Sequence, residues 1–172
     1  SLGNSISHSL RYSRELINYK KENKRSNIAY TIPVVFHIVH NGGAENISKE
    51  QVLNGLEVIN NDFKRLNSDS INTRSIFLPI AANCEIEFKL AQRDPLGNCT
   101  DGITRNLSPL SVSANNDVKS VVSWDNNNYL NIWVVQSIES SSGGITAGYA
   151  YLPQPNQSAE YDGILIGHNY VG

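Results

Sequence analysis

Hydrophobic and polar positions divide the chain into a polar amino-terminal stretch and a core that begins near residue 30. Residues 31–40 carry apolar side chains at both odd and even positions, which is typical of a strand covered on both faces. Asn41, Gly42 and Gly43 follow and predict a turn. We therefore expect the core sheet to begin with a buried strand over 31–40.

The next patterned segment, residues 48–66, has the period of an amphipathic helix. Its apolar side chains recur every three to four residues, at Val52, Leu56, Ile59, Phe63 and Leu66. Ser48 and Gln51 fit a capping box, and Ile47 and Val52 are placed as a hydrophobic staple. The pattern predicts one long helix whose apolar stripe lies against the sheet.

Alternating positions predict a second strand at 84–92, with Ile86, Phe88 and Leu90 on one face. A strand, a helix and a strand in this order favour a right-handed crossover to a parallel neighbour. Further strands are expected at 129–136, 145–152 and 162–167. The second of these three is expected at a sheet edge, because a proline follows it.

Residues 107–128 are rich in Ser, Asn and Asp and predict an irregular connection with one helical turn near Val118. Together these segments predict an α/β fold in which a five-stranded, twisted, mixed sheet is backed by one helix.

Composition fits a single globular domain behind a leader. The 172 residues are 40% hydrophobic and 17% charged. A net charge of −2 gives no reason to expect a nucleic-acid partner, and no apolar run has the length of a membrane span. Residues 1–28 are polar and predict a leader, a pro-segment remnant or a linker; residues 29–172 form the domain. The basic cluster at 20–25 is either a protease-sensitive joint or a solvated linker.

Two cysteines, Cys84 and Cys99, enclose a short segment. A disulfide would close a loop of about 15 residues and contribute roughly 3 kcal/mol. The low charge and the many Asn and Ser residues agree with an exported protein, which favours the bridge over two reduced thiols.

Candidate catalytic and metal sites are weak. His37 and His40 lie three apart in a predicted strand, so their side chains point to opposite faces and do not share a metal. His168 is isolated, and no GxSxG motif is present. Residues 94–102 carry many oxygen ligands but lack the spacing and terminal glutamate of an EF-hand, so they predict a tight turn. Calcium remains a second candidate cofactor, without an assigned site.

Several stretches, taken in order, resemble the amino-terminal subdomain of pappalysin-type metzincins, in particular the bacterial cytophagalysin and ulilysin branch. The matching stretches are IPVVFHIV (32–39), NDFKRLN (61–67), IEFKLA (86–91), DP (94–95), DGITR (101–105), YLNIWV (129–134), GYA (148–150) and DGI (162–164). The resemblance implies a metzincin-like subdomain with an antiparallel edge strand. It also implies a secreted or cell-surface bacterial zinc endopeptidase that hydrolyses peptide bonds.

In that family the next segment carries an HExxHxxGxxH helix, whose histidines bind zinc and whose glutamate polarises the attacking water. No such spacing occurs here. We therefore expect this chain to be an inactive substrate-rim half, with no catalytic residue and no zinc ligand of its own. The zinc ligands are expected after Gly172, in a carboxy-terminal subdomain that is a partner of this one.

The resemblance implies that a predicted edge strand lines the substrate groove, through Ala147, Gly148, Tyr149, Ala150 and Tyr151. An extended peptide can pair with such a strand, and a glycine lets its backbone approach closely. Gly148→Val is therefore expected to weaken peptide turnover more than folding, since the strand itself is expected to tolerate valine. The alternative is an ordinary edge strand blunted by Pro153.

Two other functions stay open. One is a non-catalytic, protease-derived binding or scaffold module. The other is an α/β module, adhesin-like, that shares only the strand pattern. The residues after Gly172 would separate the zinc endopeptidase from both.

Overall fold

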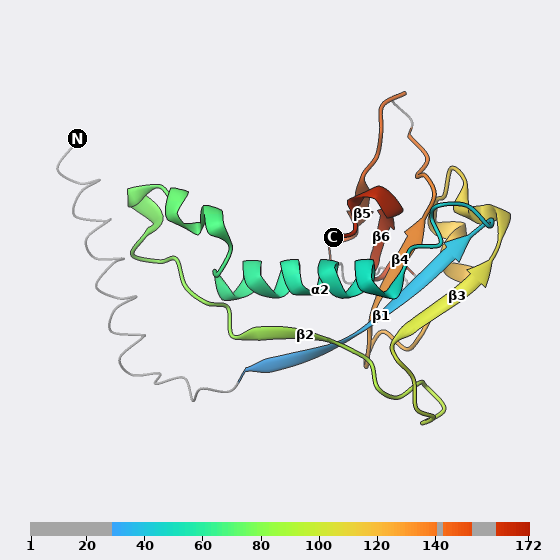
Figure 1. Ribbon diagram of the computed structural model, residues 1–172, viewed down its shortest axis with the longest axis horizontal. Coiled ribbons are helices and arrows are strands. Elements are labelled where there is room, and N and C mark those ends of the chain that lie inside the picture. The colour runs from blue at the N-terminus through green and yellow to red at the C-terminus, as the bar shows by residue number, and fades with distance from the viewer. Residues whose placement is uncertain (1–28, 141–142, 153–160) are drawn as a thin grey trace.

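The computed structural model describes residues 29–140, 143–152 and 161–172. Its centre is a six-stranded sheet with the order β2-β1-β4-β6-β5, in which β3 is a further neighbour of β1 (Figure 1). The strands are β1 (Tyr30–His40), β2 (Ile86–Leu90), β3 (Ile103–Leu107), β4 (Leu130–Val135), β5 (Gly148–Ala150) and β6 (Ile164–Gly167). Only β5 is antiparallel to its neighbour. The α/β class, the mixed sheet and the antiparallel edge strand are thus confirmed.

All five predicted strands are present, and four of them are shorter than predicted. The sixth, β3, was missed. Strands β2 and β3 lie one after the other along the same side of β1. β2 pairs with the first half of β1, and β3 pairs with the second half. Gly102 makes this possible, since it has a φ of +71° and a Cβ there would lie 2.8 Å from the Ala91 nitrogen.

The predicted helix is α2 (Lys49–Lys64), which lies across one face of the sheet (Figure 1). Ser48 caps it by accepting a hydrogen bond from the Gln51 N–H at 3.2 Å. The Gln51 side chain does not return to Ser48. Its Nε2 donates instead to the carbonyls of His168 and Val171, at 3.1 and 2.8 Å. The helix start is therefore confirmed, and Gln51 ties the carboxy-terminal residues to α2.

Two apolar cores lie on opposite faces of the sheet. One, which includes Val34 and Phe36, is closed by α2 through Val52. The other surrounds the fully buried Trp133 and is closed by Ala114, Val118 and Ile138, from the segments before and after β4. This second layer contains the short 3-10 helices η3 (Pro109–Ser111) and η4 (Asn116–Ser120), and η4 is the helical turn predicted near Val118. Because β1 and β4 contribute to both cores, their sequences are apolar on both faces.

The other 3-10 helices lie outside these two layers. They are η1 (Ser68–Asn72) and η2 (Ser75–Phe77) after α2, and η6 (His168–Tyr170) after β6.

The predicted disulfide is wrong for this structure, in which Cys84 and Cys99 are exposed, free thiols. Strand β2 separates them. Cys84 precedes the strand, whereas Cys99 lies past its far end, where its backbone forms an isolated antiparallel β-bridge with that of Arg93. Five extended residues span roughly 17 Å, and a disulfide needs Cα atoms within about 7 Å of each other.

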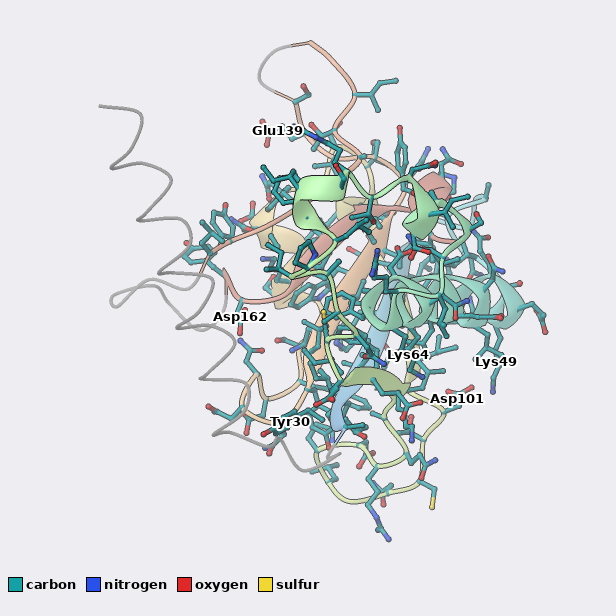
Figure 2. All side chains as sticks on the ribbon, turned by 90° about the vertical axis from the view of Figure 1, so that its left-hand side faces the viewer. Tyr30, Lys49, Lys64, Asp101, Glu139 and Asp162 are labelled. Carbon is teal, nitrogen blue, oxygen red and sulfur yellow. The ribbon has the colours of Figure 1, made fainter. Side chains whose placement is uncertain are left out.

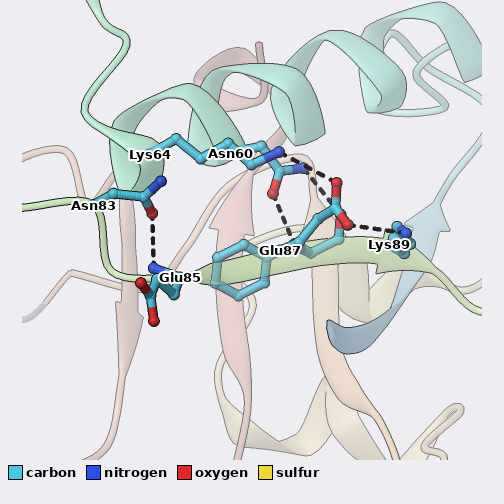
Figure 3. A network of polar contacts seen from close by, with 7 residues as sticks. Asn60, Lys64, Asn83, Glu85, Glu87 and Lys89 are labelled. Carbon is cyan, nitrogen blue, oxygen red and sulfur yellow. Dashed lines mark hydrogen bonds and ion pairs between the residues drawn. The ribbon is translucent and has the colours of Figure 1, made fainter. Parts of the chain in front are cut away.

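The outer edge of β2 is closed by α2 (Figure 3). The Asn60 amide donates to the Phe88 carbonyl at 2.9 Å and accepts from the Phe88 N–H at 2.8 Å, as a neighbouring strand would. Beside it, Glu87 forms ion pairs with Lys64 at 3.2 Å and Lys89 at 2.9 Å. These two lysines hold the pKa of the Glu87 carboxyl below its usual value.

The predicted leader, residues 1–28, lies outside the described residues. Within the described part of the chain, no helix combines the length and the apolar character needed to cross a membrane.

Candidate functional site

The candidate site is the edge strand β5, which pairs with β6 on one side only. The Gly167 N–H donates to the Ala147 carbonyl at 2.8 Å, and Tyr149 lies opposite Leu165. In an antiparallel ladder, alternate residues point their N–H and C=O groups toward the partner strand. Ala147 and Tyr149 therefore face β6, while the backbone groups of Gly148 and Ala150 face away from it. No strand in the described part of the chain pairs with this outer edge.

The predicted site residues thus divide into two sets. Gly148 and Ala150 are exposed and offer backbone hydrogen-bonding groups at the sheet edge. Tyr149 packs its ring against the core around Trp133, and Tyr151 follows the strand with its ring 5.7 Å from that of Tyr149. The backbone of the first pair can bind a peptide, whereas the tyrosines anchor the strand.

The structure corrects the expectation that the strand tolerates valine at position 148. A Cβ on Gly148 would lie 2.9 Å from the Leu165 carbonyl oxygen and 3.4 Å from the Ile166 Cα. Real Cβ atoms do not approach backbone so closely, so β5 and β6 would have to separate. Glycine is required here by the strand pair itself, whatever binds at the edge.

Two side chains that sequence reasoning missed hold the tyrosines. Asn116 and Lys119, both from η4, contact Tyr149 and Tyr151 from the face opposite α2. They border a polar cavity of about 750 Å³. Their segment has no hydrophobic period, and their partners lie about 30 residues further along the chain, so no local signal identifies them.

His37 is fully buried in β1, and both of its ring nitrogens have partners. Asn131 Oδ1 also accepts from the Trp124 N–H, so it accepts from His37 Nε2–H at 2.8 Å. Nδ1 then accepts from the Thr104 hydroxyl at 2.8 Å. Burial lowers the His37 pKa from 6.5 to about 4, against the opposing effect of the Asn131 hydrogen bond. The ring is therefore neutral at pH 7 and serves the fold.

The two other histidines in the described part of the chain have partners elsewhere. His40 accepts a hydrogen bond from the Gly42 N–H at 3.3 Å, and His168 Nδ1 lies 3.2 Å from the Gln136 carbonyl. Across the described residues, no three His, Cys, Asp or Glu side chains come together as a metal site. The tight turn predicted near Asp94 is present: the Asp94 carboxylate accepts from the N–H groups of Leu96 and Asn98. The described residues therefore do not fit a zinc ion.

Ion pairs at the molecular surface lie away from this edge. Figure 2 shows Lys49, at the start of α2, beside Asp101, which precedes β3; their charged atoms are 3.0 Å apart. Both side chains are about half exposed, so the pair contributes little stability.

A second feature is an apolar groove of about 330 Å³ between α2 and the sheet. Its lining includes Leu56, Ile59, Ile132, Ile164, Ile166 and Val171. Ile164 and Ile166 lie on β6, beside β5, and are only partly buried. The groove is thus continuous with the strand pair that carries the candidate site, and its apolar lining suits an apolar protein segment.

Comparison with solved structures identifies mirolysin as a protein of similar fold. Mature mirolysin from Tannerella forsythia, in complex with a cleaved peptide, is 39% identical with a TM-score of 0.73; the match covers 84% of this chain and 54% of that one. A promirolysin mutant from the same organism is 34% identical with a TM-score of 0.70, over 95% and 56%. Mirolysin in complex with compound 9 is 38% identical with a TM-score of 0.68, over 84% of this chain and 54% of that one.

The fold is that of a mirolysin-type amino-terminal subdomain. This confirms the resemblance to metzincins at the level of a metalloprotease fold. The chain spans about half the length of the mirolysin chains that it matches. No protein-family model matches the sequence, and no curated protein matches it significantly.

Proposed function

We propose that this chain is the substrate-rim half of a secreted zinc-dependent endopeptidase of the pappalysin type, and that the outer edge of β5 binds an extended peptide. The open edge carries the proposal, since Gly148 and Ala150 turn their backbone groups away from β6. The mirolysin-type fold supports it, because one mirolysin structure is a complex with a cleaved peptide.

Binding would proceed by strand addition. An incoming peptide can form up to four hydrogen bonds with the two N–H and two C=O groups of Gly148 and Ala150. Each bond contributes about 0.5–1.5 kcal/mol. The bonds fix the direction and register of the peptide but do not select its side chains, so this edge orients the substrate.

The catalytic metal would come from outside the described residues, none of which form a zinc site. We place its ligands after Gly172, in a carboxy-terminal subdomain. The apolar groove between α2 and the sheet is the surface on which that subdomain would pack, since Val171 and Gly172 are among its lining residues. Residues 1–28 would be a leader or pro-segment remnant that precedes the domain.

The test compares the 172-residue chain with the protein that continues past Gly172. We expect the short chain to bind no zinc tightly and to cleave no casein. The longer protein should bind about one zinc per chain and lose activity to a chelator. Metal analysis and a casein-cleavage assay on both proteins check this. Stoichiometric zinc in the short chain would contradict the proposal.

The alternative is a non-catalytic binding or scaffold module with the same open edge. The observation that favours it is that the described residues combine no metal site with outward-facing backbone groups on Gly148 and Ala150. A longer, zinc-loaded protein that binds peptides without cleaving them would establish this alternative.

A further inference from the structure

A buried lysine lies behind the edge strand. Lys119, on η4, is 4% exposed, which is rare for this residue type. Its Nζ donates to the Tyr161 carbonyl at 2.8 Å. It also lies 5.2 Å from the ring centre of Trp133, 5.4 Å from that of Tyr151 and 5.9 Å from that of Tyr149. One ammonium thus contacts β4, the edge strand and the segment that leads into β6.

Asn116, on the same 3-10 helix, forms hydrogen bonds with both tyrosines. Its Nδ2 donates to the Tyr151 hydroxyl at 2.8 Å, and its Oδ1 accepts from the Tyr149 hydroxyl at 3.2 Å. Residues three apart in a 3-10 helix lie on the same side. Asn116 and Lys119 therefore act on the two tyrosine side chains together, one at the hydroxyls and the other at the rings.

An apolar residue would fill the position of Lys119 without the cost of burying a charge. The three surrounding rings and the Tyr161 carbonyl offset that cost, since a cation within about 6 Å of an aromatic face is attracted to it. Burial lowers the Lys119 pKa below its usual value, and the Asp162 carboxylate opposes this shift by favouring the charged form. The Lys119 ammonium therefore attracts the rings of Trp133, Tyr149 and Tyr151.

The strand that these side chains hold is otherwise weakly fixed. β5 has three residues and one neighbour. Tyr149 and Tyr151 flank Ala150, and side chains two apart lie on the same face of a strand. Fixing both rings fixes the rotation of the strand about its axis, and with it the direction of the outward N–H and C=O groups of Ala150.

We propose that Lys119 and Asn116 are positioning residues that fix β5 in the orientation required for peptide pairing. This inference rests on the proposed function. A strand held in the bound orientation before the peptide arrives loses less entropy on binding. The two residues touch no substrate and act through Tyr149 and Tyr151.

The test is Lys119→Met in the complete protease, since methionine keeps the apolar volume and removes the charge. We expect KM for a peptide substrate to rise roughly tenfold, with kcat changed less than twofold. Tyr151→Phe, which removes one of the two Asn116 hydrogen bonds, should raise KM by about twofold to fivefold. Hydrogen exchange of the Tyr149 amide, which the ladder directs at Leu165, should become faster in Lys119→Met.

Two controls separate positioning from stability. Lys64→Met makes the same substitution at the opposite sheet edge and should leave KM unchanged. Val118→Ala removes fully buried volume beside Lys119, so it should lower the melting temperature without raising KM. If Val118→Ala raises KM as much as Lys119→Met, or if Lys119→Met leaves KM unchanged, the inference is overturned. A wild-type protease that cleaves no peptide would instead reject the proposed function.

Discussion

The outer edges of β2 and β5 differ in what faces them. At β2, the Asn60 side chain forms both hydrogen bonds that a neighbouring strand would form with Phe88, and Lys64 and Lys89 place charges beside it (Figure 3). At β5, the backbone groups of Gly148 and Ala150 point outward, and no described strand pairs with them.

An unpaired strand edge is a site for association with other chains, and proteins usually block it. This molecule blocks the edge of β2 with a side chain and ion pairs. At the other edge, the side chains from η4 support the strand from behind and leave its backbone groups accessible. This contrast supports the proposal that the β5 edge binds a peptide.

The largest predicted effect concerns His37 in β1, a strand that lies between β2 and β5 in the sheet. His37 has a pKa of about 4 when folded and 6.5 when unfolded, so only the unfolded chain gains a proton between these values. The stabilisation from neutral His37 is therefore complete above pH 6.5. As the pH falls from 6.5 to 4, the free energy of unfolding decreases by roughly 3 kcal/mol. Urea unfolding at pH 7 and pH 4 should show this extra loss relative to His37→Gln. Equal losses in both proteins would contradict it.

The next prediction concerns the hydrogen bonds that cover the edge of β2. Asn60→Ala removes both hydrogen bonds to Phe88 and should lower the free energy of unfolding by about 2 kcal/mol. Asn61→Ala is the matched control, since it makes the same change in helix propensity one residue further along α2. Urea unfolding of both variants decides the result. Equal effects would mean that the amide does not protect the β2 edge.

A smaller effect is expected at the open edge. Gly148→Ala places a Cβ 2.9 Å from the Leu165 carbonyl oxygen and should destabilise the fold by about 1–2 kcal/mol. Ala150→Gly, at the next outward-facing position, should cost less than about 1 kcal/mol. Thermal unfolding measures both. A fully stable Gly148→Ala protein would show that β5 and β6 are less closely paired than described.

The parts of the fold that sequence predicted are those with a local pattern. α2 has an apolar period and a Ser48 cap, and β1 has apolar side chains on both faces because two cores cover it. β3 was missed because Thr104, Arg105 and Asn106 interrupt any apolar alternation. Its position follows from a turn at Gly102 and from pairing with β1 more than sixty residues earlier.

The candidate site shows the same limit. The proline after the strand predicted a sheet edge and the resemblance implied a substrate groove, but only the ladder shows that Gly148 and Ala150, rather than Tyr149, face outward. The contacts of Asn116 and Lys119 with Tyr151 join distant segments and leave no trace in spacing. The disulfide was predicted from spacing and composition, which carry no information on the extended strand between Cys84 and Cys99.

The most direct test of the open edge removes one outward N–H. Ala150→Pro deletes this donor, and proline is tolerated at a strand edge when its nitrogen faces away from the neighbouring strand. Ala150→Ser keeps the donor and is the control. With peptide binding measured on the complete protease, we predict a Kd increase of up to about tenfold for Ala150→Pro. The melting temperature should match that of Ala150→Ser. An unchanged Kd in a folded Ala150→Pro protein would contradict peptide binding at this edge.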